Sequence, residues 1–478
     1  LIAFGDRLFH AVWTPQDGAG RPFSNGFGAP LQDFEAPLLF PRNFNRVSGP
    51  DSNSCFGCHN LPVSGGGGDF VTGIFAGAQR FDFATFDVTD PFPISGSKDE
   101  QGNAVTLQSI GNFRSTVGFL GGGFIEMLAR QMTEELQILR DATLPGKSTV
   151  LVTKGVFFGV LIRNMDGSWD TTQVVGLPGS STTSTGPTKP PSLLILPFQQ
   201  AGAVVGLREF TNSALNHHFG IQSEERFGDG FDPDGDGYQN EVTIADVTAM
   251  AIYQATLPVP GRIIPDDPQI EAAVKLGEQT FVTLGCVSCH VPALPLTDDG
   301  WIFTEPGPYN PPGNLQPGQA PIVSVDLLSS SLPNPRLKKQ TNVVWVPMFS
   351  DLKLHDITSG PNDPQNPHKD PLDLNAPQGT KAFLAGTTRF LTRRLWGSAS
   401  EPPFFHHGKF LTFRDAIEAH GGEATAQINA WWALSDTKKN AVIEFLKTLV
   451  VLPKGTSCLV CNPKLTPKRW PAFPWPPP

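Results

Sequence analysis

The chain has 478 residues, of which 39% are hydrophobic and 17% are charged. This balance excludes a disordered chain, and no stretch approaches the roughly 18 consecutive apolar residues that a membrane-spanning helix requires. The formal net charge of −10 argues against nucleic acid as a partner and is compatible with a basic protein partner.

Glycine and proline together supply about a fifth of the residues, which predicts long loops around helices of modest length. In chain order we expect an amphipathic helix over 125–139, strands over 149–153 and 156–162, a helix ending near 281, and a helix that begins after Ser435. The sequence therefore predicts a mainly α chain with extensive coil. The apolar positions at helical spacing are Ile125, Leu128, Met132, Leu136 and Leu139, then Ala272, Leu276 and Phe281, then Val442, Phe445, Leu446 and Leu449.

Proline-rich sequence over 258–268 predicts a boundary between two large units. We expect an N-terminal unit over 1–257, a C-terminal unit over 258–453, and a tail over 454–478 that is rich in proline and tryptophan. The tail lies either on its own chain or on a partner subunit.

The six cysteines form three Cys-x-x-Cys pairs, and histidine directly follows the first two pairs. In Cys-x-x-Cys-His the two thiols can add to the vinyl groups of a haem, and the imidazole can bind its iron. Zinc is the main alternative, but its cysteine pairs usually lie roughly 12 to 20 residues apart, and here more than 200 residues separate them. A redox dithiol would not need the histidine. We expect two covalent haem c groups. The residues are Cys55, Cys58 and His59 for the first, and Cys286, Cys289 and His290 for the second.

Covalent haem attachment takes place outside the cytoplasm, so we expect a periplasmic or secreted protein. No basic segment followed by an apolar one opens the sequence at Leu1, and an export signal is expected to have been removed. The third pair, Cys458 and Cys461, is followed by Asn462. In an oxidising compartment this pair most simply forms a disulfide, and a third haem is the alternative.

The segment 232–241 matches the D-x-D-x-D-G pattern of a calcium loop. Carboxylates at alternate positions can surround a hard cation, but the twelfth position holds Thr243 instead of glutamate. Glu241 or Asp246 would supply the missing carboxylate, and an acidic surface turn is the alternative. The expected ligands are Asp232, Asp234, Asp236, Tyr238 and Glu241.

Together these motifs resemble the bacterial di-haem cytochrome c peroxidase superfamily, in particular its di-haem oxidoreductase branch. The resemblance extends from about Gly49 to Leu449, and it implies two cytochrome c-like haem domains with long loop insertions. The stretches that carry it are 54–59, 208–211, 216–220, 232–243, 350–356, 395–397, 405–408 and 419–424.

The resemblance implies a division of labour between the haems. In the peroxidases the N-terminal haem cleaves peroxide and the C-terminal haem supplies the electron. His59 would then bind the reactive iron, and His290 would bind the iron that accepts electrons from a small redox protein or another donor.

The resemblance also implies distal groups for the reactive haem, and these depart from the peroxidase pattern. Arg114 runs into Val117 where a proline is usual, and the acid would be Glu126. Glu126 also suits the first turn of a helix, where a carboxylate stabilises the helix dipole, so catalytic and structural roles stay open. The tryptophan between the peroxidase haems has no counterpart between Trp13 and Trp169.

The resemblance implies that the residue closing the second iron lies fourteen positions after the first histidine of a His-x-Gly turn. That turn starts at His406, which places His420 at the ligand position. The alternative is that Met348 or His355 binds the iron and His420 bonds a propionate. Of the adjacent His217 and His218, one can approach the first haem, or bond a propionate or the calcium side.

These features favour a di-haem oxidoreductase that reduces peroxide. One alternative is an electron-transfer or structural cytochrome subunit of a larger assembly, with both irons six-coordinate and the tail on a partner subunit. Another is a haem oxygenase acting on an organic substrate, since the rubber oxygenases resemble this superfamily.

Overall fold

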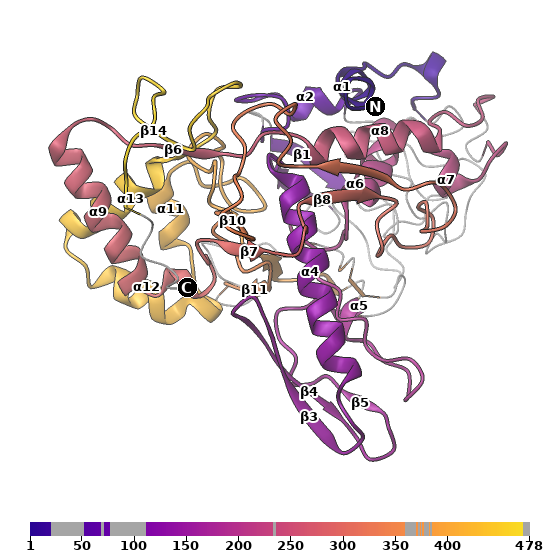
Figure 1. Cartoon of the computed structure of the whole chain (residues 1–478), viewed down its shortest axis with the longest axis horizontal. Coiled ribbons are helices and arrows are strands. Elements are labelled where there is room, and N and C mark those ends of the chain that lie inside the picture. The colour runs from indigo at the N-terminus through magenta and orange to yellow at the C-terminus, as the bar shows by residue number, and fades with distance from the viewer. Residues whose placement is uncertain are drawn as a thin grey trace, which may run out of the picture.

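A computed structural model describes residues 1–20, 52–67, 71–76, 111–232, 236–358 and 385–471, together with 370, 373, 375, 376 and 382. In this part of the chain helices and short strands alternate along the sequence (Figure 1). The helices are α1 (Ile2–His10), α2 (Cys55–Cys58), α4 (Gly122–Asp141), α5 (Gly179–Thr182), α6 (Leu207–Ala214), α7 (Glu224–Phe227), α8 (Ile244–Ala255), α9 (Pro268–Thr283), α11 (Phe413–Glu418), α12 (Thr425–Trp432) and α13 (Asp436–Lys447). The short helical turns are η1 (Pro15–Asp17), η5 (Leu215–Phe219), η6 (Cys286–Ser288) and η7 (Gly422–Ala424).

The strands pair into six small sheets within the described residues, each of two or three strands. Most pairs are antiparallel, and β14 is parallel to β6. The strands are β1 (Val71–Ala76), β2 (Gly111–Ser115), β3 (Lys147–Thr153), β4 (Val156–Arg163), β5 (Trp169–Asp170), β6 (Gly261–Ile263), β7 (Leu294–Leu296), β8 (Ile302–Glu305), β9 (Val323–Asp326), β10 (Val344–Val346), β11 (Leu354–Asp356), β12 (Arg389–Leu391), β13 (Leu449–Val450) and β14 (Val460–Cys461).

The prediction of a mainly α chain of two cytochrome c-like domains is wrong, because the helices share the molecule with these sheets. Most of the strands have only two to four residues and pair loop segments with one another. Such strands are too short to show the alternation of apolar and polar residues that identifies a strand in sequence. The division at 258–268 stays a prediction, and strand β6 lies inside it.

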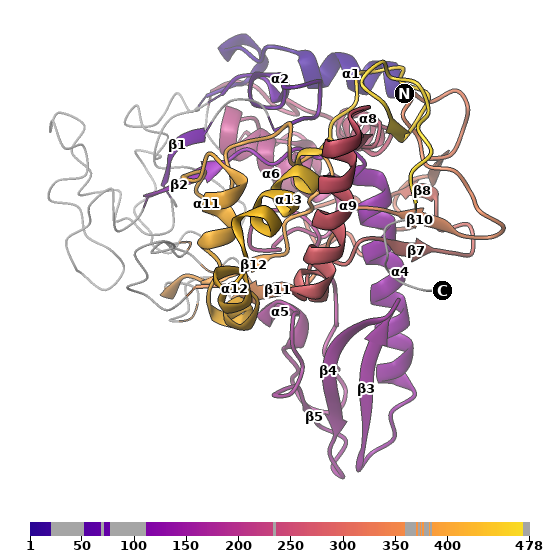
Figure 2. The ribbon, with the colours of Figure 1, turned by 90° about the vertical axis from the view of Figure 1, so that its left-hand side faces the viewer.

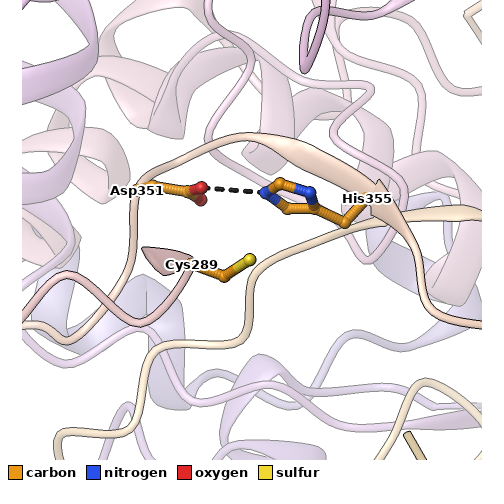
Figure 3. A group of neighbouring side chains, drawn as sticks. All are labelled: Cys289, Asp351 and His355. Carbon is orange, nitrogen blue, oxygen red and sulfur yellow. Dashed lines mark hydrogen bonds and ion pairs between the residues drawn. The ribbon is translucent and has the colours of Figure 1, made fainter. Parts of the chain in front are cut away.

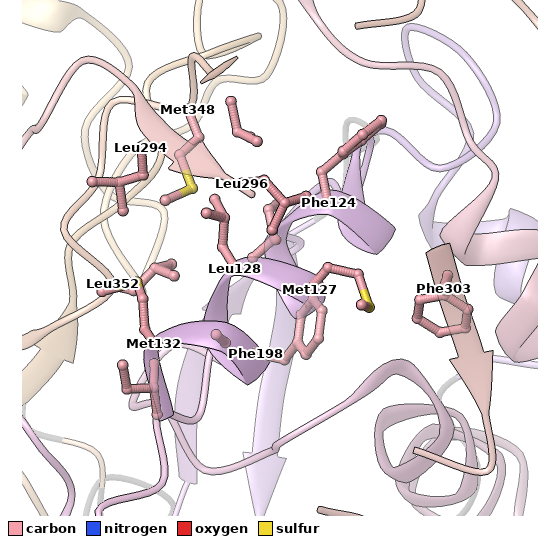
Figure 4. Packing of buried hydrophobic residues seen from close by; sticks show 14 of the residues in the cluster. Phe124, Met127, Leu128, Met132, Phe198, Leu294, Leu296, Phe303, Met348 and Leu352 are labelled. Carbon is pink, nitrogen blue, oxygen red and sulfur yellow. The ribbon is translucent and has the colours of Figure 1, made fainter. Parts of the chain in front are cut away.

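Helix α4 forms the centre of the molecule (Figure 1). Its apolar residues recur every three or four positions, so one face of the helix is fully buried, as the sequence predicts. At its start, a Cβ on Gly123 would lie 2.4 Å from the carbonyl oxygen of Ala255. Only glycine allows α4 to approach the end of α8 this closely. The main core packs around α4 (Figure 4) and includes Phe124, Leu128, Met132, Phe198, Leu294, Leu296, Phe303, Met348 and Leu352.

Strands β3 and β4 form a hairpin that projects from the body beside the end of α4 (Figures 1 and 2). Its register pairs Val150 with Val160 and Val152 with Phe157. The two strands confirm those expected at 149–153 and 156–162.

Helices α9 and α13 pack together on the other side of the molecule (Figure 2). A Cβ on Gly277 would lie 2.0 Å from the carbonyl oxygen of Ala441, so the two helices touch through their backbones. Helix α13 begins directly after Ser435, as expected. A separate apolar cluster joins these helices to α12 and includes Phe281, Val287, Phe349, Trp431, Val442 and Phe445.

The described part of the tail, up to residue 471, packs against its own chain. Strand β14 pairs with β6, and a disulfide joins Cys458 to Cys461. Lys468 then contacts Asp266 and Glu271, and Trp470 donates a hydrogen bond to Glu278 of α9 at 3.0 Å. No helix among the described residues is both long and apolar enough to cross a bilayer.

Candidate haem sites

The first Cys-x-x-Cys-His motif begins in the single helical turn α2. Residues three apart on a helix lie on one side, so Cys55 and Cys58 face the same space. The His59 amide donates to the Cys55 carbonyl at 3.0 Å and extends this turn to the histidine. Burial and then Cys58 raise the pKa of Cys55 to about 12. A thiol with this pKa is a poor redox nucleophile at neutral pH, which disfavours the dithiol alternative.

The imidazole of His59 is held by the backbone of the following loop. Its Nδ1 lies 3.1 Å from the carbonyl oxygen of Gly66, and burial lowers its pKa to about 4, with His218 nearby acting in the same direction. A neutral imidazole that donates from Nδ1 to a carbonyl presents an unprotonated Nε2, which is the arrangement of an iron ligand. The geometry therefore fits proximal ligation by His59.

A cavity of about 190 Å³ opens at this motif, and the side chains of Cys55, Cys58 and His59 line it. Segments distant in sequence supply the other walls: the 114–119 stretch, helix α6, and the segment that follows β12. The cavity thus combines the residues expected to attach a haem with largely apolar walls, which would suit this group. Other residues of the wall are Phe9, Arg114, Phe119, Leu207, Phe210, His218, Leu391, Arg393 and Arg394.

Three arginines give one part of this wall a positive charge. Arg394 donates to the carbonyl of Gly118 at 2.7 Å, and Arg393 lies 3.6 Å from Glu401, whose carboxylate accepts from the amide of Gly67 at 2.9 Å. Desolvation and then Arg393 lower the pKa of Arg394 to about 10, so it keeps its charge at neutral pH. Guanidinium groups bind carboxylates with good geometry, so these side chains fit the two propionates of a haem.

The second motif follows helix α9 directly. Gly285 has φ +79 and ends the helix, and the turn η6 then carries Cys286. The amide of His290 donates to the Cys286 carbonyl at 3.0 Å, and its Nδ1 lies 3.2 Å from the carbonyl oxygen of Phe349. Burial and then the nearby His420 lower the pKa of His290 to about 4. His290 is therefore neutral, and a backbone carbonyl next to Nδ1 fixes its ring, as in His59.

His420 follows helix α11, whose N-terminus is capped by the hydroxyl of Thr412 on the amide of Asp415. Nδ1 of His420 lies 2.8 Å from the carbonyl oxygen of Ala416, and desolvation lowers the pKa of His420. All three expected iron ligands thus have Nδ1 against a backbone carbonyl, which leaves Nε2 for a metal.

The alternative ligands of the second iron have other partners. Met348 is fully buried in the core around α4. His355 lies between two carboxylates. Its Nε2 lies 2.8 Å from Asp351 (Figure 3), and its Nδ1 lies 2.7 Å from Glu423. Although desolvation opposes it, hydrogen bonds to Asp351 and Cys289 raise the pKa of His355 to about 10. An imidazolium with both nitrogens bonded cannot bind iron, so the geometry favours His420.

Residue Glu423 connects His355 to the turn that follows His420. Its second oxygen accepts from the amide of Asp356 at 2.9 Å, and the Gly421 amide donates to the carbonyl of Ile357 at 2.8 Å. Strand β11 therefore fixes the position of the segment that carries His420. Cys289, Asp351 and His355 also form a group that could hold a metal ion, with ligand atoms within 4.8 Å of one another. If Cys289 were bonded covalently to a haem, it would not be available as a ligand of such a metal ion.

The structure separates the two residues expected on the distal side of the first haem. Arg114 lines the cavity and lies 3.5 Å from Asp370. Glu126 is 1% exposed and is not among the residues of the cavity wall. Its carboxylate accepts from Arg130 at 2.5 Å and from the amide of Leu207 at 2.8 Å. This geometry favours the structural role for Glu126.

Of the other predicted site residues, His218 lies near His59 and His406 lies outside the cavity wall. His218 lines the first cavity from the π-helical turn η5. The ring of His406 stacks on Phe390 at 3.9 Å, and its carbonyl accepts from the amide of Ser115.

In the calcium-like loop, Asp232 accepts from the amides of Asp236 and Gly237, at 3.2 and 2.9 Å. The Tyr238 amide donates to Asp236, and Glu241 accepts from the amide of Gln222. Asp234 lies outside the described residues.

Comparison with known proteins adds the family. Residues 334–449 match the family described as "Di-haem oxidoreductase, putative peroxidase". This segment, about a quarter of the chain, is similar to the di-haem oxidoreductases. No curated protein matches the chain. A solved structure of hydrazine synthase from Kuenenia stuttgartiensis, pressurized with xenon, is 15% identical and covers 67% of this chain and 87% of its own, with a TM-score of 0.28. At this score the likeness supports no conclusion about fold or function.

The di-haem oxidoreductase segment contains His420, Asp351 and His355, and it confirms the family that the sequence resembles. It also contains Arg393 and Arg394, which sequence reasoning missed. Two adjacent arginines are a feature that the sequence does show, but nothing in the sequence connects residue 393 with Cys55. The sequence likewise does not connect Glu401 with the first motif, although its carboxylate accepts a hydrogen bond from the amide of Gly67 in the loop after that motif.

Proposed function

We propose that this chain is an exported di-haem c-type cytochrome with peroxidase activity. Electrons from a small redox protein would enter at the His290 site, and peroxide would react at the His59 site. The observation that carries the proposal is the difference between the two sites. A cavity with arginines in one part of its wall lies beside His59, whereas His420 lies near enough to His290 to lower the pKa of His290, next to an apolar cluster against which Cys286 packs.

The residues of the first site would have distinct tasks. His59 would hold the cofactor through Nε2, with Gly66 fixing the ring, and Arg393 and Arg394 would bind its propionates. The bound haem would supply the redox chemistry that splits the oxygen–oxygen bond. Arg114 at the wall would stabilise the negative charge that develops on the leaving oxygen.

At the second site, His290 and His420 would both bind the haem iron. Two imidazoles donate more strongly to ferric iron than an imidazole and a thioether, so the potential of this haem would lie below that of a His/Met haem. A six-coordinate iron has no place for a substrate, which suits electron transfer.

One observation favours a second candidate, a pure electron carrier. His218 lines the same cavity as His59 and lies close enough to influence its charge. If Nε2 of His218 bound the first iron, both haems would be six-coordinate and peroxide would have no site.

The same proposal includes a calcium ion in the loop from Asp232 to Glu241. Hydrogen bonds from Asp236 and Gly237 to the Asp232 carboxylate support it, because they close the loop around its acidic side chains. Burial and then Asp232 act to raise the pKa of Asp236, and a bound cation would relieve this repulsion.

The spin state of the irons distinguishes the two candidates. Absorption and EPR spectra of the holoprotein, with and without reductant, are expected to show one high-spin and one low-spin haem, and the reduced protein should consume peroxide. Two low-spin haems without peroxide consumption would establish the carrier. In that case His218→Gln should convert one haem to high spin, whereas His406→Gln should not, because the His406 ring stacks on Phe390 and is not part of the cavity wall.

A further inference from the structure

A chain of hydrogen bonds leads from a buried tyrosine to the surface beside the first haem motif. It consists of Tyr253 of α8, Ser64 in the loop after His59, and His10 at the end of α1. We propose that Tyr253 is a redox-active tyrosine that gives one electron to the His59 site while its proton passes through Ser64 to His10. This inference rests on the proposed peroxidase function.

The distances and the hydrogen-bond directions suit proton transfer. The Tyr253 hydroxyl lies 3.0 Å from Oγ of Ser64, and this Oγ lies 3.3 Å from Nε2 of His10. Nδ1 of His10 lies 2.8 Å from the carbonyl oxygen of Asp6, so in the neutral ring Nδ1 carries the hydrogen. Nε2 is then the acceptor, Ser64 donates to it, and Tyr253 donates to Ser64.

The site can also stabilise and release the transferred proton. The Asp6 carboxylate lies 3.2 Å from Nδ1 of His10 and would stabilise the imidazolium. The His10 side chain is 36% exposed, so the proton can exchange with solvent, whereas Tyr253 is 8% exposed. Besides burial, the Asp6 carboxylate also acts to raise the pKa of the Tyr253 phenol, so Asp6 is an alternative acceptor for the same proton. Loss of an electron makes a phenol strongly acidic, and such a base beside it is what its oxidation requires.

Aromatic contacts link the tyrosine to the proximal ligand. The ring of Phe9 lies 5.4 Å from that of Tyr253 and 6.5 Å from that of His59. These residues belong to one buried cluster, against which Cys55 packs. Tyr253 is therefore separated from His59 by a single ring.

Close packing of α1 on α8 creates this arrangement. A Cβ on Gly5 would lie 2.0 Å from the carbonyl oxygen of Ala249, so only glycine lets the helices touch here. This contact places His10 and Tyr253 on either side of Ser64, and the ring of His10 lies 4.5 Å from that of Phe56, inside the haem motif.

The reaction balances with peroxide as the oxidant. Peroxide takes up two electrons and, from solvent, two protons as its oxygen–oxygen bond breaks and two water molecules form. Tyr253 supplies one electron, its proton moves to His10, and the electron-entry site supplies the other electron. The tyrosyl radical then recovers an electron from the external donor and a proton from His10.

The chain provides a matched control in Tyr309. It is one of only three tyrosines, and its hydroxyl donates to the amide oxygen of Gln137 at 3.4 Å, which is not a base. Tyr309→Phe should therefore leave radical formation unchanged. His10→Gln keeps a hydrogen-bond acceptor for Ser64 but removes the basic nitrogen, and Ser64→Ala interrupts the chain of hydrogen bonds.

The test adds peroxide and a nitroso spin trap to the reduced holoprotein, measures peroxide consumption, and locates the trapped radical by peptide mass spectrometry. We expect the adduct on Tyr253, and a several-fold lower yield in His10→Gln and in Ser64→Ala. Haem content and circular dichroism check that each variant folds, and Tyr253→Phe must lose the adduct.

The outcomes distinguish the two proposals. Peroxide consumption without an adduct on Tyr253, or with a yield that neither variant changes, would overturn the role of Tyr253 alone. Absence of peroxide consumption by the wild-type protein would refute the proposed function and, with it, this inference.

Discussion

Replacing Glu305 with glutamine is expected to change how the stability of the protein depends on pH. Glu305 is fully buried, 3.4 Å from Arg130 and 3.3 Å from Arg208, and close to Glu126. Burial and then the charge of Glu126 raise the pKa of Glu305 from 4.5 to about 7. Each tenfold change in acid dissociation corresponds to about 1.4 kcal/mol, so this shift corresponds to about 3 kcal/mol.

The sign follows from the direction of the shift. Between pH 4.5 and 7 the unfolded chain has lost this proton and the folded chain keeps it, so the contribution of Glu305 is fully present below 4.5 and is lost as the pH rises through 7. Glutamine mimics the protonated acid and does not titrate. The free energy of unfolding of Glu305→Gln should therefore rise relative to that of wild type by about 3 kcal/mol from pH 4 to pH 8.

Urea unfolding at a series of pH values measures this difference. Glu444→Gln is a suitable control, because its carboxylate is 32% exposed, its partner Lys447 is 57% exposed, and an exposed pair of this kind should contribute little. A difference between wild type and Glu305→Gln that is the same at all pH values would refute the assignment of a buried, protonated Glu305.

Three further predictions address the haems and the calcium loop. His420→Gly should convert one low-spin haem to high spin with both haems still attached, and an unchanged low-spin spectrum would remove His420 as a ligand. Mass spectrometry of the denatured protein should find two haems and not three, and Cys458→Ser should keep both while limited proteolysis cuts the tail faster. Chelation of calcium should lower the Tm of wild type, because a ligand of the folded state stabilises it. Asp236→Asn should reduce that shift, and a Tm that chelation does not change would leave the loop as an acidic turn.

Local patterns predicted much of the architecture, because they depend on neighbours in sequence. The buried face of α4 follows from its helical period, and the hairpin of β3 and β4 follows from two short apolar runs. Each Cys-x-x-Cys-His motif could be recognised from five consecutive residues. The disulfide between Cys458 and Cys461 followed from a pair without a histidine.

Features that depend on distant segments were not predictable in this way. The wall of the first cavity joins residue 59 to residues 393 and 394, and Tyr253 meets Ser64 across 189 positions. Glu126 is an intermediate case. Its partner Arg130 stands four residues later on the same helix and was visible in the sequence, but Glu305 and Leu207 were not.

The central position of β6 has a consequence for shortened forms of the protein. In its sheet β6 lies between β13 and β14, so the strand is hydrogen-bonded on both sides. A product that stops before Cys458 would lack β14, and β6 would present open amide and carbonyl groups to other chains. Such a product is expected to aggregate even where both haem motifs are intact. Strand β14 thus protects a strand that is synthesised almost 200 residues earlier.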